Sequence, residues 1–363
     1  MAESGSNAIR FGILGCAEIS RKVARAISLS PNSTLHAIGS RSLEKAQTFA
    51  TTNSFDPSTK VYGSYDEVID DPEVDAVYVP LPTSLHLQWV VRAAEKKKHV
   101  IVEKPPALDV KELDVMLNAC KANGVQYMDG TMWMHHPRTK IMTDFLADSQ
   151  RFGHLKAVHA IFTFLADDYF LKNDIRVKPD LDALGALGDV GWYCIRAILW
   201  AANYELPKFV TALRNPIRND DGVLLSCDAA LHWEDGKIAT FHCSFLSHLT
   251  MDITVIGTNG TLHVNDFLIP YKASEVSFKT ASKCWFTDKA LEWTHKSSEQ
   301  VVSTDLPQEV LMVKEFSGLV DGIKFRDLAP EMKWPTISRK TQLVIDAVKV
   351  SIDKGLQAVE VVY

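Results

Sequence analysis

A glycine-containing turn follows the first apolar segment of the chain. Ile9–Leu14 has the composition of a buried strand, and Gly15, Ala17 and Ser20 then form the pattern G-x-A-x-x-S ahead of an amphipathic stretch. A glycine permits a tight turn, and a small alanine lets the backbone approach a pyrophosphate at the N-terminus of the next helix. The pattern predicts a dinucleotide-binding turn, with an ordinary strand–helix turn as the alternative. The residues expected to contact the cofactor here are Gly15, Cys16, Ala17, Glu18 and Ile19.

The residues after the second apolar segment indicate which dinucleotide is bound. An NAD site places an acidic residue there to accept hydrogen bonds from the ribose 2′-hydroxyl. In this chain Ser40 and Arg41 follow residues 35–39. A hydroxyl and a guanidinium suit a 2′-phosphate, which a carboxylate would repel. We therefore expect NADP(H) rather than NAD(H). The alternative is that Arg41 is merely exposed at the start of the next helix and that another region selects the cofactor.

A lysine between a glutamate and a proline follows a further apolar segment. Glu103, Lys104 and Pro105 come directly after His99–Val102, and ligands of parallel α/β sheets bind at such carboxyl ends of strands. Pro105 favours an extended conformation at Lys104. The ammonium could there contact a substrate hydroxyl and the nicotinamide ribose. The alternative is a surface ion pair between Glu103 and Lys104.

Alternating strands and helices would position these residues. The expected strands cover 9–14, 35–39, 74–80, 99–102 and 125–128, and the expected helices cover 19–29, 43–50, 85–98 and 109–124. Asp109 and Glu112 form a helix-capping pattern, and Asn123-Gly124 is a helix-ending pair. This alternation predicts an α/β Rossmann domain with a doubly wound parallel sheet.

The periodicity changes after residue 135. The expected strands are 154–164, 208–215, 223–233, 238–247 and 250–264, and the expected helices are 189–201, 307–322 and 336–353. Asp235-Gly236 and Asn259-Gly260 are hairpin signals. Grouped strands predict an α+β domain with a large, open, mostly antiparallel sheet covered by helices on one face. We expect an NADP-binding domain over 1–135 and a substrate-binding and dimerisation domain over 136–363, with a homodimer formed through the open sheet.

The composition argues against several classes of protein. The 363 residues are 46% hydrophobic and 23% charged, with a net charge of −6, and acidic and basic residues are interspersed. This pattern disfavours a nucleic-acid or membrane-binding surface. The N-terminal residues lack the apolar core of a secretory signal, and the six cysteines form no C-x-x-C pair. We therefore expect a cytoplasmic protein without a disulfide framework. His135-His136 does not predict a metal site, because consecutive extended residues point in opposite directions.

Several motifs occur together in one order along the chain. They are the turn at Gly15, Ser40-Arg41, Pro-Leu-Pro-Thr-Ser-Leu-His over 80–86, Glu-Lys-Pro over 103–105 and Gly-Ala-Leu-Gly-Asp-Val-Gly-Trp-Tyr over 185–193. In this combination the chain resembles the Gfo/Idh/MocA oxidoreductase family over essentially its whole length. One departure is Asp182-Ala183-Leu184, which replaces part of a glycine-rich approach to the last motif and would reshape the substrate site.

The resemblance implies that Lys104 is catalytic and that the last motif supplies an acid, Asp189, and a tyrosine, Tyr193. Residues four apart lie on one helix face. Other relatives have a histidine at this position. With its tyrosine the chain resembles the branch of dimeric dihydrodiol dehydrogenases and NADP-dependent sugar dehydrogenases. The alternatives are an N-cap role for Asp189, a half-buried helix aromatic for Tyr193 and a surface arginine for Arg176. The residues that the resemblance adds to the cofactor site are Pro80, Leu81, Pro82, His86, Glu103, Lys104, Trp133 and Arg176.

These expectations describe an NADP(H)-dependent oxidoreductase that acts on CH–OH groups of a small molecule. Hydride would pass between the nicotinamide and a polyhydroxylated substrate, either an aldose or a cyclic vicinal diol. Tyr193 would act as general acid or base, with its pKa of about 10 lowered by Lys104 and by the oxidised nicotinamide. Lys104 would also stabilise the alkoxide. The alternatives are a non-catalytic NADP(H)-binding regulatory or redox-sensor protein, and an enzyme that retains its cofactor for elimination or hydrolysis.

Overall fold

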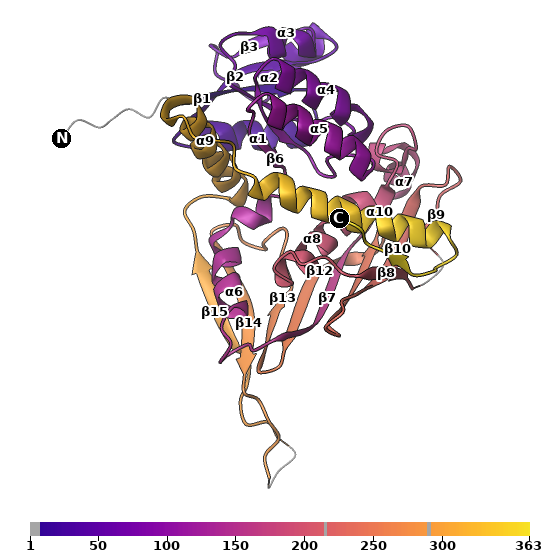
Figure 1. The fold of residues 1–363 in the computed structure, drawn as a ribbon. Helices are drawn as coiled ribbons and strands as arrows, with labels where there is room; N and C mark the ends of the chain where they lie inside the picture. The colour runs from indigo at the N-terminus through magenta and orange to yellow at the C-terminus, as the bar shows by residue number, and fades with distance from the viewer. Residues whose placement is uncertain (1–7, 214–215, 289–291) are drawn as a thin grey trace, which may run out of the picture. The chain divides into compact units, whose positions relative to one another are not determined.

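The computed structural model describes residues 8–213, 216–288 and 292–363, which divide into two compact units (Figure 1). The first unit comprises Met1–His135 and Pro307–Arg339, and the second comprises His136–Leu306 and Lys340–Tyr363. The sequence predicts residues 136–363 as one domain, whereas the structure groups 307–339 with the first unit. The reason is a tertiary contact, because Phe316 is fully buried and packs on Phe11 with ring centroids 5.9 Å apart.

The first unit contains a six-stranded parallel sheet in the order β3-β2-β1-β4-β5-β6. Its strands are β1 (Ile9–Leu14), β2 (Ser33–Gly39), β3 (Lys60–Tyr62), β4 (Ala76–Val79), β5 (His99–Val102) and β6 (Tyr127–Asp129). The order reverses between β1 and β4, so the predicted doubly wound sheet is confirmed. The short β3 was not predicted from the sequence, because its three residues are only partly buried.

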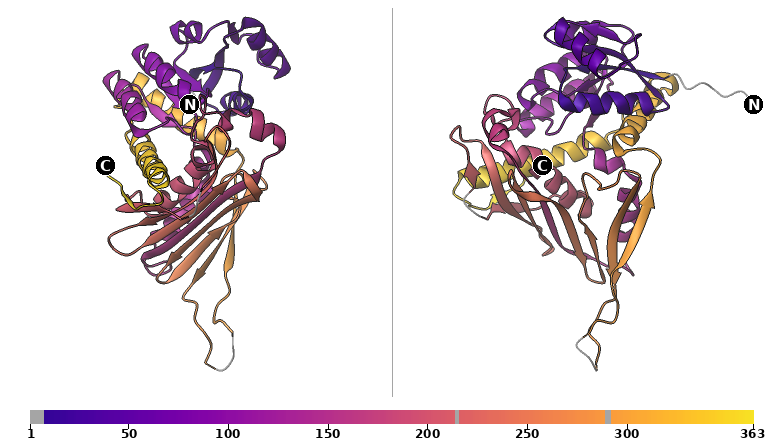
Figure 2. Two further views of the ribbon diagram at one scale, coloured as in Figure 1. Left: turned by 90° about the vertical axis from the view of Figure 1, so that its right-hand side faces the viewer. Right: turned by 180° about the vertical axis from the view of Figure 1, so that it is seen from behind.

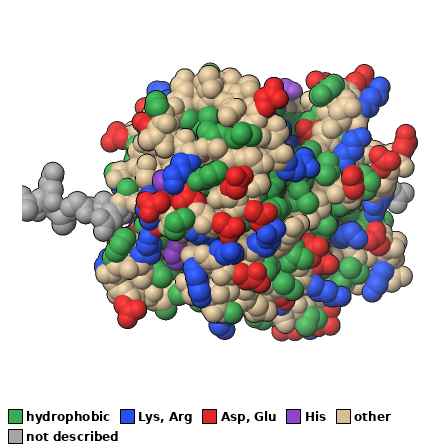
Figure 3. Space-filling model, turned by 90° about the horizontal axis from the view of Figure 1, so that it is seen from above, with side chains coloured by type: hydrophobic (Ala, Val, Ile, Leu, Met, Phe, Trp, Pro, Cys, Tyr) green, Lys and Arg blue, Asp and Glu red, His purple; other side chains and the backbone are tan. Residues whose placement is uncertain are grey.

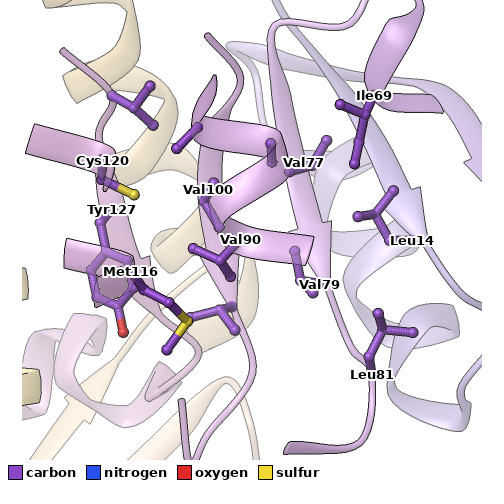
Figure 4. Packing of buried hydrophobic residues seen from close by; sticks show 14 of the residues in the cluster. Leu14, Ile69, Val77, Val79, Leu81, Val90, Val100, Met116, Cys120 and Tyr127 are labelled. Atoms are coloured by element: carbon purple, nitrogen blue, oxygen red, sulfur yellow. The ribbon is translucent and has the colours of Figure 1, made fainter. Parts of the chain in front are cut away.

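Helices provide the apolar residues that pack on this sheet. They are α1 (Glu18–Leu29), α2 (Leu43–Thr52), α3 (Tyr65–Asp70), α4 (Thr83–Glu95), α5 (Val110–Ala122), η1 (Met132–His135) and α9 (Gln308–Arg326). Figure 4 shows Val77 and Val100 of the sheet in one cluster with Val90 of α4 and Met116 of α5. The strands are continuous apolar runs because a parallel sheet is buried on both faces. The predicted helix cap is confirmed, since the Asp109 side chain accepts a hydrogen bond from the Glu112 N–H at 2.9 Å.

The second unit contains a ten-stranded sheet in the order β15-β14-β13-β12-β7-β11-β10-β8-β16, with β9 paired to β10. Its strands are β7 (Leu155–Leu165), β8 (Phe209–Ala212), β9 (Ile217–Arg218), β10 (Leu224–His232), β11 (Ile238–Ser244), β12 (Leu246–Gly257), β13 (Gly260–Val264), β14 (Glu275–Ser282), β15 (Ser298–Ser303) and β16 (Val359–Glu360). Only the β7–β11 pair is parallel among these described strands. The predicted, mostly antiparallel sheet is confirmed.

The hairpin signals fall where the chain reverses direction. Asp235-Gly236 joins β10 to β11, and Gly236 has a φ of +83°. The range 250–264 contains two antiparallel strands, β12 and β13, and the predicted turn at Asn259-Gly260 lies where they meet. The expected strand 208–215 is β8, and its last two residues lie outside the described part of the chain. β14 and β15 were missed; in β15 only Val302 is buried.

Helices cover one face of the second sheet, and within the described residues its other face carries no helix (Figure 2). They are α6 (Pro137–Leu146), α7 (Asp168–Asn173), η2 (Ile175–Val177), η3 (Leu187–Gly191), α8 (Trp192–Ala201) and α10 (Lys333–Asp353), the last of which continues from the first unit. α8 is apolar around its circumference and packs on β7 and β11. The predicted one-sided helical layer is confirmed.

His99, at the start of β5, is a buried histidine held in its neutral form. Its side chain is 6% exposed, and Nδ1 accepts a hydrogen bond from the Gln126 N–H at 3.0 Å. Burial, assisted by the positive charge of Lys324, lowers the pKa of His99 to about 4. Protonation would remove the acceptor and place a charge in the core.

We predict that His99 makes the stability of the protein dependent on pH in the acidic range. Below about pH 6.5 this histidine is protonated in the unfolded chain, whereas in the folded chain it stays neutral down to about pH 4. The unfolding free energy therefore falls as the pH falls. The loss from this residue is about 2–3 kcal/mol by pH 4.5. His99→Asn keeps an acceptor near the Nδ1 position without titrating. Chemical denaturation at pH 7 and pH 4.5 should show a smaller loss for this variant, and equal losses would contradict the assignment.

Candidate active site

The turn after β1 is held by hydrogen bonds of the protein itself. Gly15 has a φ of +120°, and its N–H donates to the Gly39 carbonyl at 2.8 Å. The Ser20 hydroxyl donates to the Gly15 carbonyl at 2.9 Å and accepts from the Ala17 N–H at 3.1 Å. A Cβ at position 15 would lie 3.1 Å from Leu81 Cδ2. Both the conformation and the close approach therefore require glycine.

Three backbone N–H groups at this turn fit an anion. Within the described residues no group accepts a hydrogen bond from the N–H of Cys16, Glu18 or Ile19. Glu18 begins α1, and the preceding Ala17 is extended, as an N-cap residue is. Unpaired N–H groups at a helix N-terminus bind phosphate. The predicted turn residues therefore have the geometry that a dinucleotide pyrophosphate requires.

Cationic and hydroxyl groups gather at the end of β2. Ser40 is buried and interacts with the thiol of Cys16, whose pKa is raised by burial. Arg41 is exposed and interacts with the hydroxyl of Tyr65. The charge of Lys45, in the first turn of α2, also acts on the Cys16 thiol. The sequence assigns Ser40 and Arg41 to the cofactor site, and that assignment stays a prediction. Lys45 was not predicted, although a lysine in the first turn of the following helix was a usable signal.

A surface groove lies beside this group of residues. Glu18 and Arg21 of α1 line one side, and Ser42 and Lys45 of α2 line the other. On the face of the molecule that Figure 3 shows, acidic and basic side chains are interspersed rather than segregated. The groove itself also carries charges of both signs, with Glu18 and Glu44 beside Arg21 and Lys45.

His86 connects two loops at the carboxyl edge of the first sheet. Its side chain is 1% exposed, with Nε2 2.7 Å from the Leu81 carbonyl and Nδ1 3.1 Å from the Pro106 carbonyl. These oxygens only accept hydrogen bonds, so each contact is a hydrogen bond only where the facing ring nitrogen carries a proton. The structure thus places His86 in the interior, where it holds the loop of Pro80, Leu81 and Pro82 against the loop after β5. Pro80 and Leu81 are buried, and Pro82 is partly exposed.

Glu103 is directed inward beside Lys104. Its carboxylate accepts hydrogen bonds from the buried Tyr78 hydroxyl at 2.5 Å and from the Lys104 N–H at 3.2 Å. Burial raises the pKa of Glu103. A Cβ at position 130 would lie 2.7 Å from Glu103 Oε1, so Gly130 leaves room for the carboxylate. Glu103 therefore supports the backbone of Lys104. This inward position differs from the surface ion pair that was the alternative. The Lys104–Pro105 peptide bond is cis.

Trp133 and the two histidines after it have separate environments. Trp133 is buried in η1 of the first unit. His135 Nδ1 lies 2.8 Å from Glu315 Oε2, and the ring stacks on Trp334. His136 caps α6 by accepting from the Arg138 N–H at 3.0 Å. Among the described residues, no three acidic, histidine or cysteine side chains are grouped as metal ligands.

Asp189 lies within an unusual helical turn of the second unit. Leu187–Gly191 is a π-helix that continues directly into α8, so Asp189 is internal and the N-cap alternative is wrong. Gly185 has a φ of +56°, and a Cβ there would collide with the Leu224 carbonyl. A Cβ at Gly191 would lie 3.1 Å from Cys243 Sγ. Close packing on β10 and β11 therefore fixes this turn, and π turns of this kind are frequent at functional sites.

Tyr193 and Arg176 belong to the same unit as Asp189. Tyr193 is the second residue of α8, is 5% exposed, and has its ring 5.9 Å from that of Phe162. Arg176 Nε lies 3.2 Å from Asp189 Oδ1. Asp189, followed by Asp174 and Asp182, raises the pKa of Arg176. Sequence reasoning named Arg176 and Asp189 separately, and the structure pairs them. Lys104 belongs to the first unit.

Comparison with known proteins identifies the family. Residues 9–131 match the model of an oxidoreductase family with an NAD-binding Rossmann fold, and residues 145–263 match the GFO/IDH/MocA C-terminal domain. A D-xylose 1-dehydrogenase (NADP(+)) from Haloferax volcanii is 33% identical over 74% of this chain and 80% of its own length. The chain belongs to the GFO/IDH/MocA family of oxidoreductases.

Other similar proteins agree with this assignment. A trans-1,2-dihydrobenzene-1,2-diol dehydrogenase from Danio rerio is 30% identical over 71% of this chain and 74% of its own length. The solved structure of a 3-ketoreductase from Actinomadura kijaniata, in complex with NADP and TDP-benzene, has a TM-score of 0.81 at 25% identity and covers 95% of this chain and 98% of that chain. The predicted family, fold class and nicotinamide-dependent oxidoreductase activity are confirmed. The relatives are enzymes, which disfavours the regulatory alternative.

We predict that Gly15→Ala weakens cofactor binding while the protein remains folded. The residue must adopt a φ of +120° against Leu81, and a strained conformation of this kind costs about 1–3 kcal/mol. If the turn relaxes to avoid this cost, NADPH affinity should fall about tenfold or more, measured by fluorescence titration. Gly318→Ala, in open space on α9, is the matched control. Unchanged NADPH affinity in Gly15→Ala would contradict the role of the turn.

Proposed function

We propose that the chain is an NADP(H)-dependent dehydrogenase or reductase of a polyhydroxylated small molecule, either an aldose or a cyclic vicinal diol. The observation that carries the proposal is the presence in one chain of a nicotinamide-binding turn with Lys104, Asp189 and Tyr193. A protein that only sensed NADP(H) would need none of these three side chains. Relatives named as a D-xylose dehydrogenase and a dihydrobenzenediol dehydrogenase support the substrate class.

NADP(H) is proposed over NAD(H) on the residues at the end of β2. Ser40, Arg41 and Lys45 supply a hydroxyl and two cations near the turn, and Tyr65 supports the Arg41 guanidinium. These groups suit a 2′-phosphate. The relative from Haloferax volcanii uses NADP(+), and the similar ketoreductase was solved with NADP.

Three side chains would perform the reaction. When bound, the nicotinamide supplies or accepts the hydride. Tyr193 would donate its phenolic proton to a carbonyl oxygen in reduction and remove the hydroxyl proton in oxidation. Lys104 would stabilise the negative charge on that oxygen with its ammonium. Asp189 would orient the substrate by accepting a hydrogen bond from a neighbouring hydroxyl.

Location and assembly form part of the same proposal. No helix in the described residues is long and apolar enough to cross a membrane. All six cysteines are free, including Cys227 and Cys243, whose sulfurs are 3.4 Å apart, which supports a reducing, cytoplasmic location. The helix-free face of the second sheet, with Ile238 38% exposed, supports a homodimer by sheet-on-sheet packing.

We predict that Arg41→Ala and Lys45→Ala each weaken NADPH binding by about tenfold or more while changing NADH binding less than threefold. Each substitution removes a charge-assisted contact to the 2′-phosphate, worth about 1.5–3 kcal/mol. Titration of both cofactors by fluorescence measures the two affinities. Arg25→Ala, an exposed arginine on α1, is the control for loss of charge. Equal losses for NADPH and NADH would remove these residues from cofactor selection.

We predict that Lys104→Met and Tyr193→Phe each lower kcat by about 10²–10⁴-fold, the size of a lost proton-transfer or charge-stabilising group. NADPH affinity should stay within threefold of the wild type. Turnover is followed at the reduced-nicotinamide absorbance band with a panel of pentoses, hexoses and cyclic vicinal diols. Wild-type protein that binds NADPH tightly and turns over none of the panel would instead favour a sensor. Substantial turnover by either variant would exclude that residue from catalysis.

A further inference from the structure

Arg176 links two carboxylates of the second unit. Its Nε lies 3.2 Å from Asp189 Oδ1, and its Nη1 lies 3.1 Å from Asp174 Oδ1. The Asp189 side chain is 13% exposed and that of Arg176 is 38% exposed, so the ion pair is partly shielded from water. The two donors point from different edges of the guanidinium. A single ammonium could not reproduce both contacts in the same geometry.

The segment that carries Arg176 is fixed at several other points. The Asp174 side chain caps η2 by accepting from the Arg176 N–H at 2.9 Å. The Asn219 side chain donates to the Val177 carbonyl at 2.9 Å. The Ala183 N–H donates to the Lys178 carbonyl at 3.1 Å. The side-chain contact of Arg176 with Asp189 links residues 174–183 to η3.

We propose that Arg176 is a positioning residue that holds the Asp189 carboxylate in one orientation and fixes residues 174–183 on the π turn. The inference deepens the proposed function, because it rests on Asp189 as the acid that orients the substrate. It also revises the expectation that Arg176 contacts the cofactor. With its carboxylate held by Arg176, Asp189 has a defined orientation toward a hydroxyl group of the substrate.

The first test measures whether loss of Arg176 affects kcat/KM for the substrate or the affinity for NADPH. Arg176→Ala should lower kcat/KM for the best panel substrate by 10- to 100-fold, mainly through KM, and leave NADPH affinity within twofold. Guanidinium at millimolar concentration should restore part of kcat/KM, because it can enter the partly exposed site. Arg176→Lys should recover less than the guanidinium does. Lys178→Ala is the control, since this lysine of the same segment donates to the Lys172 carbonyl. A tenfold loss of NADPH affinity in Arg176→Ala would overturn the proposal in favour of cofactor binding.

A double-mutant cycle tests whether Arg176 acts through Asp189. In the Asp189→Asn background, Arg176→Ala should lower kcat/KM by less than a further twofold. Independent, multiplicative losses would overturn the proposal.

A readout that needs no turnover separates this proposal from the proposed function. Hydrogen exchange of backbone amides in 174–191 should be faster in Arg176→Ala and in Asp189→Asn than in the wild type, and unchanged in Lys178→Ala. Unaltered exchange in both variants would overturn the positioning role even if the protein is a dehydrogenase. Faster exchange with no substrate turned over would support the positioning role and reject the proposed activity.

Discussion

The hydrogen bond from the Gly15 N–H to the Gly39 carbonyl joins the two loops that we propose bind and select the cofactor. Gly15 follows β1 and Gly39 ends β2, and the carboxyl ends of β1, β2, β4 and β5 share one edge because these strands are parallel. Loops that are far apart in sequence therefore meet at that edge. Ser20 braces the turn after β1, His86 ties the loops after β4 and β5, and Tyr78 anchors Glu103. Each of these bonds joins groups of the protein itself, and together they hold the loops at one edge of the sheet.

Much of this arrangement follows from the sequence, because its causes are local. Strands buried on both faces are continuous apolar runs, which is why β1, β4 and β5 were predicted nearly to the residue. Gly15 and Asp109 were found because their roles depend on neighbours within a few positions. β3 and β15 escaped prediction because they bury few side chains. The assignment of Ser40 and Arg41 to the cofactor site rests on the same local reasoning, because both residues directly follow a strand, and it stays a prediction.

The features that the sequence did not predict are contacts between distant segments. The apolar face of α9 was visible in its periodicity, but its packing of Phe316 on Phe11 places 307–339 in the first unit, and no local pattern encodes that partner. His86, which the sequence assigns to the cofactor site, is buried between the carbonyls of Leu81 and Pro106, and no local pattern encodes this pair of contacts. The pairing of Arg176 with Asp189 likewise depends on how η2 meets η3. Sequence patterns identify which residues carry chemistry, whereas tertiary packing decides which of them touch a ligand and which support another side chain.

Different interactions hold the candidate site residues in place in the two units. In the first unit, loops at a sheet edge are held by hydrogen bonds to backbone carbonyls. In the second, Asp189 stands on a π turn whose glycines allow contact with β10 and β11, and Tyr193 follows on the same continuous helix. A helix packed this closely on a sheet cannot shift without steric conflict at Gly185 or Gly191, so the backbone of Asp189 is fixed by packing. Its side chain forms an ion pair with Arg176. Packing therefore fixes the backbone of Asp189, and we propose that the ion pair orients its carboxylate.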